Sequence, residues 1–142
     1  MGEGYKQYEP EVLKKIQQEE LKVLKEFIRI CDKYDINYFG VFGTVIGTVR
    51  HQGFIPWDDD MDFGMLRDDY EKFKKVVPGE FGDRFGLAGP DCDQKYYNFV
   101  SKMYKKNTRF ATNYDHGNFE MGINIDIFVF DDLAMNRKAR NK

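Results

Sequence analysis

The chain has 142 residues, 42% of them hydrophobic, which is enough to bury the core of one domain. Its 22 basic and 24 acidic residues give a formal net charge of -2, so it lacks the strongly positive field that sequence-independent nucleic-acid binding requires. We therefore expect a single domain over residues 1–142 and no nucleic-acid partner.

The cysteines and the apolar stretches exclude two further classes of protein. Cys31 and Cys92 are the only cysteines, and neither belongs to a CxxC pair or to a Cys/His cluster with zinc-ligand spacing. The longest apolar stretch, around residues 38–49, is too short and too rich in glycine to span a bilayer. We expect a cytoplasmic protein with reduced thiols and no transmembrane segment, with a peripheral position at the inner membrane face as the alternative.

The first third of the chain predicts a helix, a strand and a second helix. Apolar residues recur every three or four positions over residues 11–34, which indicates an amphipathic helix packed on a sheet. Aromatic and β-branched residues over 38–42 predict a short buried strand that ends at Gly43. We expect Thr44 to cap a short helix over residues 45–50.

The middle of the chain predicts a strand, a longer helix and a third strand. The strand is expected over residues 61–65. The helix over 67–77 has acidic residues in its first turn and lysines further on, which is the charge order that favours a helix, and Pro78-Gly79 is expected to end it. Between the glycines that follow, we expect a short strand over residues 85–88.

The last third predicts strands only. Residues 96–104 and 108–111 are expected to form a hairpin around a turn at 105–107. The segment 122–130, "GINIDIFVF", is the clearest strand, because its isoleucines share one face while Asp126 lies on the other.

Four aspartates lie next to Trp57, at positions 58, 59, 60 and 62. In a strand, Asp60 and Asp62 project to the same side, and two such carboxylates repel each other by about 1 kcal/mol in water. A divalent cation relieves this repulsion, because hard ions such as Mg²⁺ prefer carboxylate oxygens and bind substrate phosphates at the same time. We interpret Asp60 and Asp62 as part of a phosphate-handling metal site. The alternative is an acidic surface loop with solvated side chains.

Three neighbouring features favour the metal interpretation. Gly43 and Thr44 lie where a strand meets a helix, so the free N–H groups of the helix start can bind an anion. Arg50 and His51 add positive donors, and Arg50 can bind a phosphate through two parallel hydrogen bonds. Asp126 is costly if it is buried alone, so we interpret it as a third metal ligand or a base, with a solvated edge strand as the alternative.

Aromatic residues near the acidic stretch provide candidate walls for a ligand. Trp57, Phe54 and Tyr38 can enclose a nucleotide base or a choline-like cation by stacking or cation–π contact, with core packing as the alternative for each. Neither the dinucleotide fingerprint G-x-G-x-x-G nor a P-loop is present in the chain.

The stretch "GTVIGTVRHQGFIPWDDDMDFGMLRDDYEKF", residues 43–73, closely resembles the signature of the LicD/fukutin family of phosphotransferases. The segments "YYNFVSKMYKKNTRF" and "GINIDIFVFDD" resemble the Lys-x-x-x-x-x-Thr and Ile-Asp-Ile-Phe strands of the same family. The resemblance runs over residues 13–132, with a gap at 81–93. It implies an α/β (α+β), nucleotidyltransferase-like fold, a mixed twisted sheet flanked by helices. Family members typically extend past the last strand, so we expect a chain truncated at its C-terminus or a reduced member.

The resemblance also implies roles for individual residues. Gly43 and Thr44 correspond to the phosphate turn, Asp60 and Asp62 to the metal-binding pair, and Asp126 to the third carboxylate, with Mg²⁺ or Mn²⁺ as the cofactor. The implied reaction is transfer of phosphocholine, or of a related phosphorylated alcohol, from a CDP-linked donor to a cell-surface glycan or glycolipid such as lipopolysaccharide or teichoic acid.

Our leading hypothesis is therefore a metal-dependent phosphotransferase. Two ions near Asp60, Asp62 and Asp126 would neutralise the diphosphate, stabilise the leaving CMP and activate the acceptor hydroxyl, with Asp126 as a candidate base. The alternatives are a nucleotidyltransferase that moves the NMP group and a non-catalytic nucleotide-binding domain.

Overall fold

The computed structural model describes residues 8–92, 96, 98–110 and 121–133. Within these ranges, no helix is both long enough and apolar enough to cross a membrane. The elements in chain order are α1 (Pro10–Tyr34), β1 (Phe39–Gly40), α2 (Phe42–His51), β2 (Asp62–Leu66), α3 (Arg67–Phe81), β3 (Phe85–Ala88), β4 (Ser101–Lys105) and β5 (Asn124–Phe130).

The five strands form one mixed sheet in the order β1-β2-β5-β4-β3. Strand β2 runs parallel to β5, and the other neighbouring pairs are antiparallel. This mixed sheet flanked by helices confirms the expected α+β class. Because β5 is the central strand, the alternative that Asp126 lies on a solvated edge strand is wrong.

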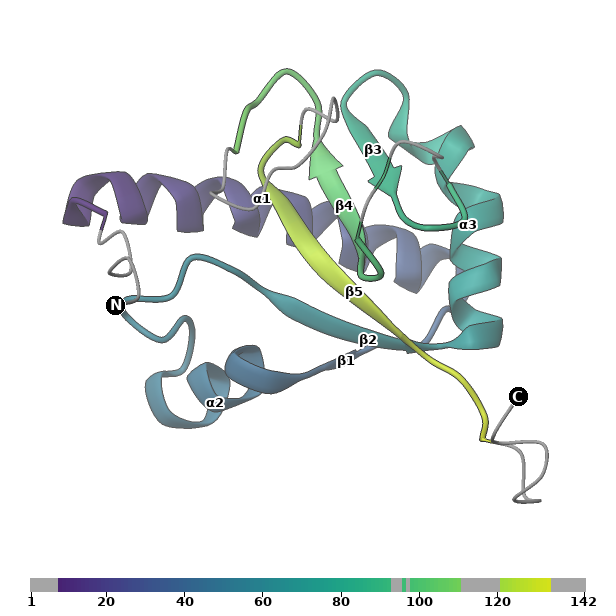
Figure 1. Cartoon of the computed structure of the whole chain (residues 1–142), viewed down its shortest axis with the longest axis horizontal. Coiled ribbons are helices and arrows are strands. Elements are labelled where there is room, and N and C mark those ends of the chain that lie inside the picture. The colour runs from purple at the N-terminus through teal and green to yellow at the C-terminus, as the bar shows by residue number, and fades with distance from the viewer. Residues whose placement is uncertain (1–7, 93–95, 97, 111–120, 134–142) are drawn as a thin grey trace.

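Helices α1 and α3 pack against the sheet and against each other, and their apolar side chains form the main core (Figure 1). Ile125 and Ile127 of β5 are fully buried in this core, whereas Asp126 between them is half-buried, as the alternation of a strand requires. The amphipathic pattern of α1 and the strand pattern of β5 are thereby confirmed. Other fully buried core residues are Val23, Phe27, Ile30, Cys31, Met65, Phe73 and Met103.

The first strand and the second helix differ from the expected boundaries. Strand pairing is limited to Phe39–Gly40, and α2 begins at Phe42, so the prediction that Thr44 caps this helix is wrong. The extended residue Val41 occupies the capping position instead. The Thr44 hydroxyl accepts a hydrogen bond from the backbone N–H of Asp62 at 2.7 Å, so a contact with β2 uses the oxygen that would otherwise serve as the cap.

Helix α3 continues to Phe81, although Pro78-Gly79 predicts an earlier end. Contacts from outside the helix hold its last turn. Phe81 is buried in the core, and Glu80 accepts a hydrogen bond from Arg29 of α1 at 2.6 Å. These contacts offset the loss of the backbone hydrogen bond that a proline inside a helix cannot donate.

The expected hairpin after β4 is also wrong. Strand β4 pairs with β3 on one side and with β5 on the other, so no edge is left for a partner at 108–110, and residue 111 lies outside the described ranges. Thr108 instead closes the turn after β4. Its hydroxyl donates to the Lys105 carbonyl at 2.7 Å and accepts from the Ile123 N–H at 2.9 Å, which fixes the start of β5. The expected strand at Phe85–Ala88 is confirmed.

Candidate active site

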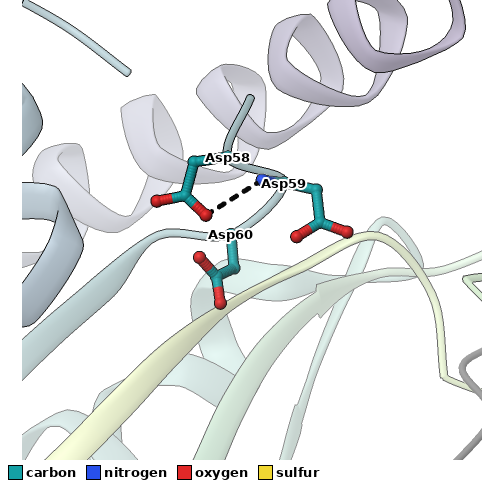
Figure 2. A group of neighbouring side chains, drawn as sticks. All are labelled: Asp58, Asp59 and Asp60. Atoms are coloured by element: carbon teal, nitrogen blue, oxygen red, sulfur yellow. Dashed lines mark hydrogen bonds between the residues drawn. The ribbon is translucent and has the colours of Figure 1, made fainter. Parts of the chain in front are cut away.

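Three consecutive aspartates lie on the loop that leads into β2 (Figure 2). Asp58, Asp59 and Asp60 each place a carboxylate oxygen within 4.8 Å of the others. The loop is held by local hydrogen bonds, from the Asp58 N–H to the Ile55 carbonyl at 2.9 Å and from the Asp59 N–H to Asp58 Oδ1 at 3.1 Å. Gathered carboxylate oxygens are the ligands that hard divalent cations prefer. We call these three residues the acidic loop.

A second charged group runs across the sheet beside the acidic loop. Asp62 on β2 is in register with Asp126 on β5, which is in register with Lys102 on β4. The Lys102 ammonium forms an ion pair with Asp126 and also donates to Asn124 Oδ1 at 3.3 Å. The sheet therefore carries two neighbouring carboxylates with one ammonium beside the second of them.

The predicted metal ligands divide between these two groups. Asp60 belongs to the acidic loop, whereas Asp62 and Asp126 belong to the row across the sheet. Lys102 received no role in the sequence analysis, although it is the lysine of the Lys-x-x-x-x-x-Thr pattern and alternates with buried Ser101 and Met103. That alternation is the signal that places it on the same face of the strands as Asp126.

The environment of these carboxyl groups disfavours their charged forms. Burial raises the pKa of Asp62 to about 6, and the negative charges of Asp126 and Asp58 add to the shift. The pKa of Asp60 is also raised, first by lost hydration and then by a hydrogen bond with Asp58 and by the charge of Asp62. The site therefore has an excess of negative charge that a bound cation would relieve.

Gly43 and Thr44, the predicted phosphate turn, lie in the first turn of α2 beside the acidic loop. A Cβ atom on Gly43 would lie 3.0 Å from Asp58 Oδ2, so the absence of a side chain permits this close approach. Both residues line a cavity of about 390 Å³ whose wall also includes Asp58 and Asp60. Most of the remaining lining is apolar: Leu21, Leu24, Val45, Val49, Phe54, Ile55, Met61 and Phe63. A cavity of this size with a few polar groups is typical of small-molecule sites.

The backbone just before this turn is strained. Phe42 adopts a φ of 50°, a left-handed conformation that costs a non-glycine residue about 1–3 kcal/mol. Its ring packs edge-on against Phe128 of β5 with ring centroids 4.9 Å apart, which helps to hold it there. No sequence pattern indicates this feature, because the strain depends on a contact with a distant strand.

Among the other predicted ligand-binding residues, Phe54 lines the cavity, whereas Arg50, His51, Trp57 and Tyr38 lie outside its wall. Arg50 and His51 form the exposed last turn of α2. Trp57 is 75% exposed, and its ring lies edge-on to His51 at a centroid distance of 6.3 Å. Tyr38 instead packs edge-on against Phe27 in the core, so the core-packing alternative is confirmed for Tyr38.

The fold and the site define an α+β domain in which carboxylates gather around the start of two parallel strands. The family described as LicD/FKTN/FKRP, nucleotidyltransferase domain, matches residues 35–140. The chain belongs to this family, and the resemblance identified from its motifs is confirmed.

Sequence identity to curated proteins supports this family membership. The chain is 34% identical over 112 residues to the lipopolysaccharide cholinephosphotransferase LicD of Haemophilus influenzae, a match that covers 78% of this chain and 41% of that protein. Uncharacterized proteins of Rickettsia typhi and Rickettsia prowazekii are 39% and 37% identical over 57 residues, which is 40% of this chain and 18% and 21% of theirs. The chain thus spans less than half the length of the curated relatives it matches.

Proposed function

We propose that the chain forms the donor- and metal-binding part of a transferase that moves phosphocholine, or a related phosphorylated alcohol, from a CDP-linked donor to a cell-surface glycan. Membership of the family and the similarity to a lipopolysaccharide cholinephosphotransferase support the transferase class. The observation that carries the proposal is the acidic loop beside the Asp62 and Asp126 pair, next to a cavity lined by Gly43 and Thr44.

Mg²⁺ or Mn²⁺ fits the donor set at this site. The candidate ligands Asp60, Asp62 and Asp126 all offer carboxylate oxygens, and the pKa of Asp62 is raised first by burial and then by the negative charges of Asp126 and Asp58. When bound, the cation would neutralise the diphosphate of the donor and stabilise the charge on the leaving group.

The chain's own residues would orient the donor and the acceptor. The free N–H groups in the first turn of α2, around Gly43 and Thr44, are suited to a donor phosphate. Further along the same helix, Arg50 adds positive charge and His51 adds an imidazole. Asp126 is the proposed base for the acceptor hydroxyl. Lys102 positions its carboxylate through their ion pair, and Trp57 offers an exposed ring for the donor base or for the head group.

The test is ³¹P NMR of the products formed by the full chain with CDP-choline, Mn²⁺ and a lipopolysaccharide acceptor. We expect CMP and a phosphocholine-modified acceptor, and we expect Asp60→Asn and Asp62→Asn to abolish both. Asp83→Asn, which neutralises an exposed aspartate before β3, is the matched control and should retain turnover. A nucleotide-linked acceptor would instead support an NMP transferase, and calorimetric binding of CDP-choline without turnover would support a non-catalytic domain.

A further inference from the structure

Helix α1 carries a buried carboxyl group with an unpaired oxygen. Glu20 is only 3% exposed, and its Oε2 atom has no hydrogen-bond partner within the described part of the chain. Buried polar atoms are almost always paired, because an unpaired one has lost its hydration without gaining a partner. A carboxylate retained under these conditions requires a physical reason.

Glu20 lies on the side of α1 that holds the acidic loop. One turn earlier, Gln17 Nε2 donates a hydrogen bond to the Asp58 carbonyl at 2.8 Å, and residues three positions apart lie on the same side of a helix. Just before α1, burial raises the pKa of Tyr8, and the neighbouring Asp59 carboxylate adds to the shift. The N-terminal half of α1 therefore contacts the acidic loop, and the charges of that loop act on Glu20.

The charged groups that act most strongly on Glu20 are aspartates. Burial raises its pKa, and the charges of Asp60, Asp59, Asp58 and Asp126 raise it further. A carboxyl group on which four other carboxyl groups act, from the loop and from β5, is close to the point where a cation would reduce the most repulsion.

Two lysines near this part of α1, one on the helix and one on β4, pair with Glu19 and not with Glu20. Lys22 and Lys105 both form ion pairs with the adjacent residue Glu19, which points to a different side of the helix. The two neighbouring glutamates thus have opposite surroundings. Glu19 is paired with lysines, whereas Glu20 faces aspartates.

We propose that Glu20 is a further carboxylate ligand of the divalent cation at the acidic loop, contributed by α1. This inference rests on the proposed function, because it concerns the same cation. A cation bound by Oε2 of Glu20 and by Asp60, the loop ligand that both proposals share, would pair the orphaned oxygen and would compensate the gathered charge. It would also join α1 to the segment that enters β2, so that cation binding organises the loop as well as the ligand site.

The test is Mn²⁺ binding to the full chain, without any donor, measured at pH 7.5 by calorimetry and by the electron paramagnetic resonance signal of free Mn²⁺. We expect Glu20→Gln to weaken Mn²⁺ binding at least tenfold. Glu19→Gln is the matched control, with the same substitution at the next position, and should change the Kd less than twofold. In the absence of metal, we expect Glu20→Gln to melt at or above the wild-type temperature, because the buried carboxyl must take up a proton on folding at this pH, whereas an amide is already neutral.

The outcomes separate this inference from the proposed function. If Glu20→Gln binds Mn²⁺ like the wild type while Asp60→Asn does not, the role of Glu20 is refuted and the metal site stands. If the wild-type chain binds no Mn²⁺, both are refuted. Should Glu20→Gln fail to fold, Glu20→Asp provides the same measurement with the charge retained on a shorter side chain, and an unchanged Kd in that variant overturns the inference.

Discussion

The backbone N–H of Asp62 donates a hydrogen bond to the Thr44 hydroxyl at 2.7 Å, across 18 positions of the sequence. This bond ties the first turn of α2 to the first residue of β2. It places the candidate phosphate turn beside a candidate metal ligand, and the Val41 N–H supports the same arrangement by donating to the Asp62 carbonyl at 3.1 Å.

Replacing Thr44 with valine should therefore destabilise the chain by about 1–3 kcal/mol, because the N–H of Asp62 loses its partner while the volume of the side chain is conserved. Urea unfolding followed by circular dichroism measures this change. Thr44→Ser keeps the hydroxyl and should lose less than half as much. A valine variant as stable as the wild type would show that this hydrogen bond does not hold α2 on β2.

Much of the fold is predictable from the sequence because it depends on local periodicity. The three- and four-residue spacing of apolar residues defines α1, and strict alternation around Asp126 defines β5. The run of aspartates after Trp57 also indicates an acidic site without further information. In each case the signal is a repeat of side-chain character along a single element.

Other features depend on partners that are distant in the sequence. The extension of α3 past Pro78 requires contacts of Glu80 with α1, and no local rule contains them. The ion pair of Lys102 with Asp126 becomes evident only when β4 is placed next to β5. Helical spacing places Glu20 on the apolar face of α1, three residues before Val23, but the aspartates that act on it become evident only in the fold.

Gly43→Ala should weaken cation binding while it leaves the stability of the chain nearly unchanged. Alanine favours a helix over glycine by about 1 kcal/mol, but its Cβ would lie 3.0 Å from Asp58 Oδ2 and would push that carboxylate aside. We expect a weaker Kd for Mn²⁺ by several-fold, with little loss of stability. The control is Gly79→Ala in α3, where nothing lies within 4 Å of the added Cβ, and it should leave the Kd unchanged. Equal Mn²⁺ affinity in both variants would contradict the close packing of Gly43 on the site.

Lys102→Met should raise the pH below which protonation of the carboxylates weakens Mn²⁺ binding. The Lys102 ammonium lowers the pKa of Asp62 and pairs with Asp126, so its removal makes proton loss from Asp62 less favourable. Titration of the Asp62 carboxyl by NMR, together with the Kd for Mn²⁺ from pH 5 to pH 8, measures the shift. Lys102→Arg retains the positive charge and should keep this pH near its wild-type value. If the methionine variant also keeps the wild-type value, Lys102 has no such electrostatic role.

The stability of the metal-free chain should fall as the pH rises from about 5 to 9. The pKa of Asp62 is raised to about 6 and that of Glu20 to about 9, so over this interval the folded chain holds protons that the unfolded chain has released. Glu80 acts in the opposite direction, since its pKa is lowered to about 2 by Lys33, Arg29 and Tyr34, but its contribution is lost only below about pH 4.5.

Urea unfolding at several pH values, with and without Mn²⁺, tests this dependence. The cation competes with protons for the same carboxylates, so its stabilising effect should be larger at pH 8 than at pH 5.5. Glu20→Gln should flatten the decline of the metal-free chain, because the amide does not titrate. If the metal-free wild type gained stability between pH 5 and 9, the carboxyl groups around the acidic loop would be ionised without cost, and the electrostatic reason for a cation at this site would disappear.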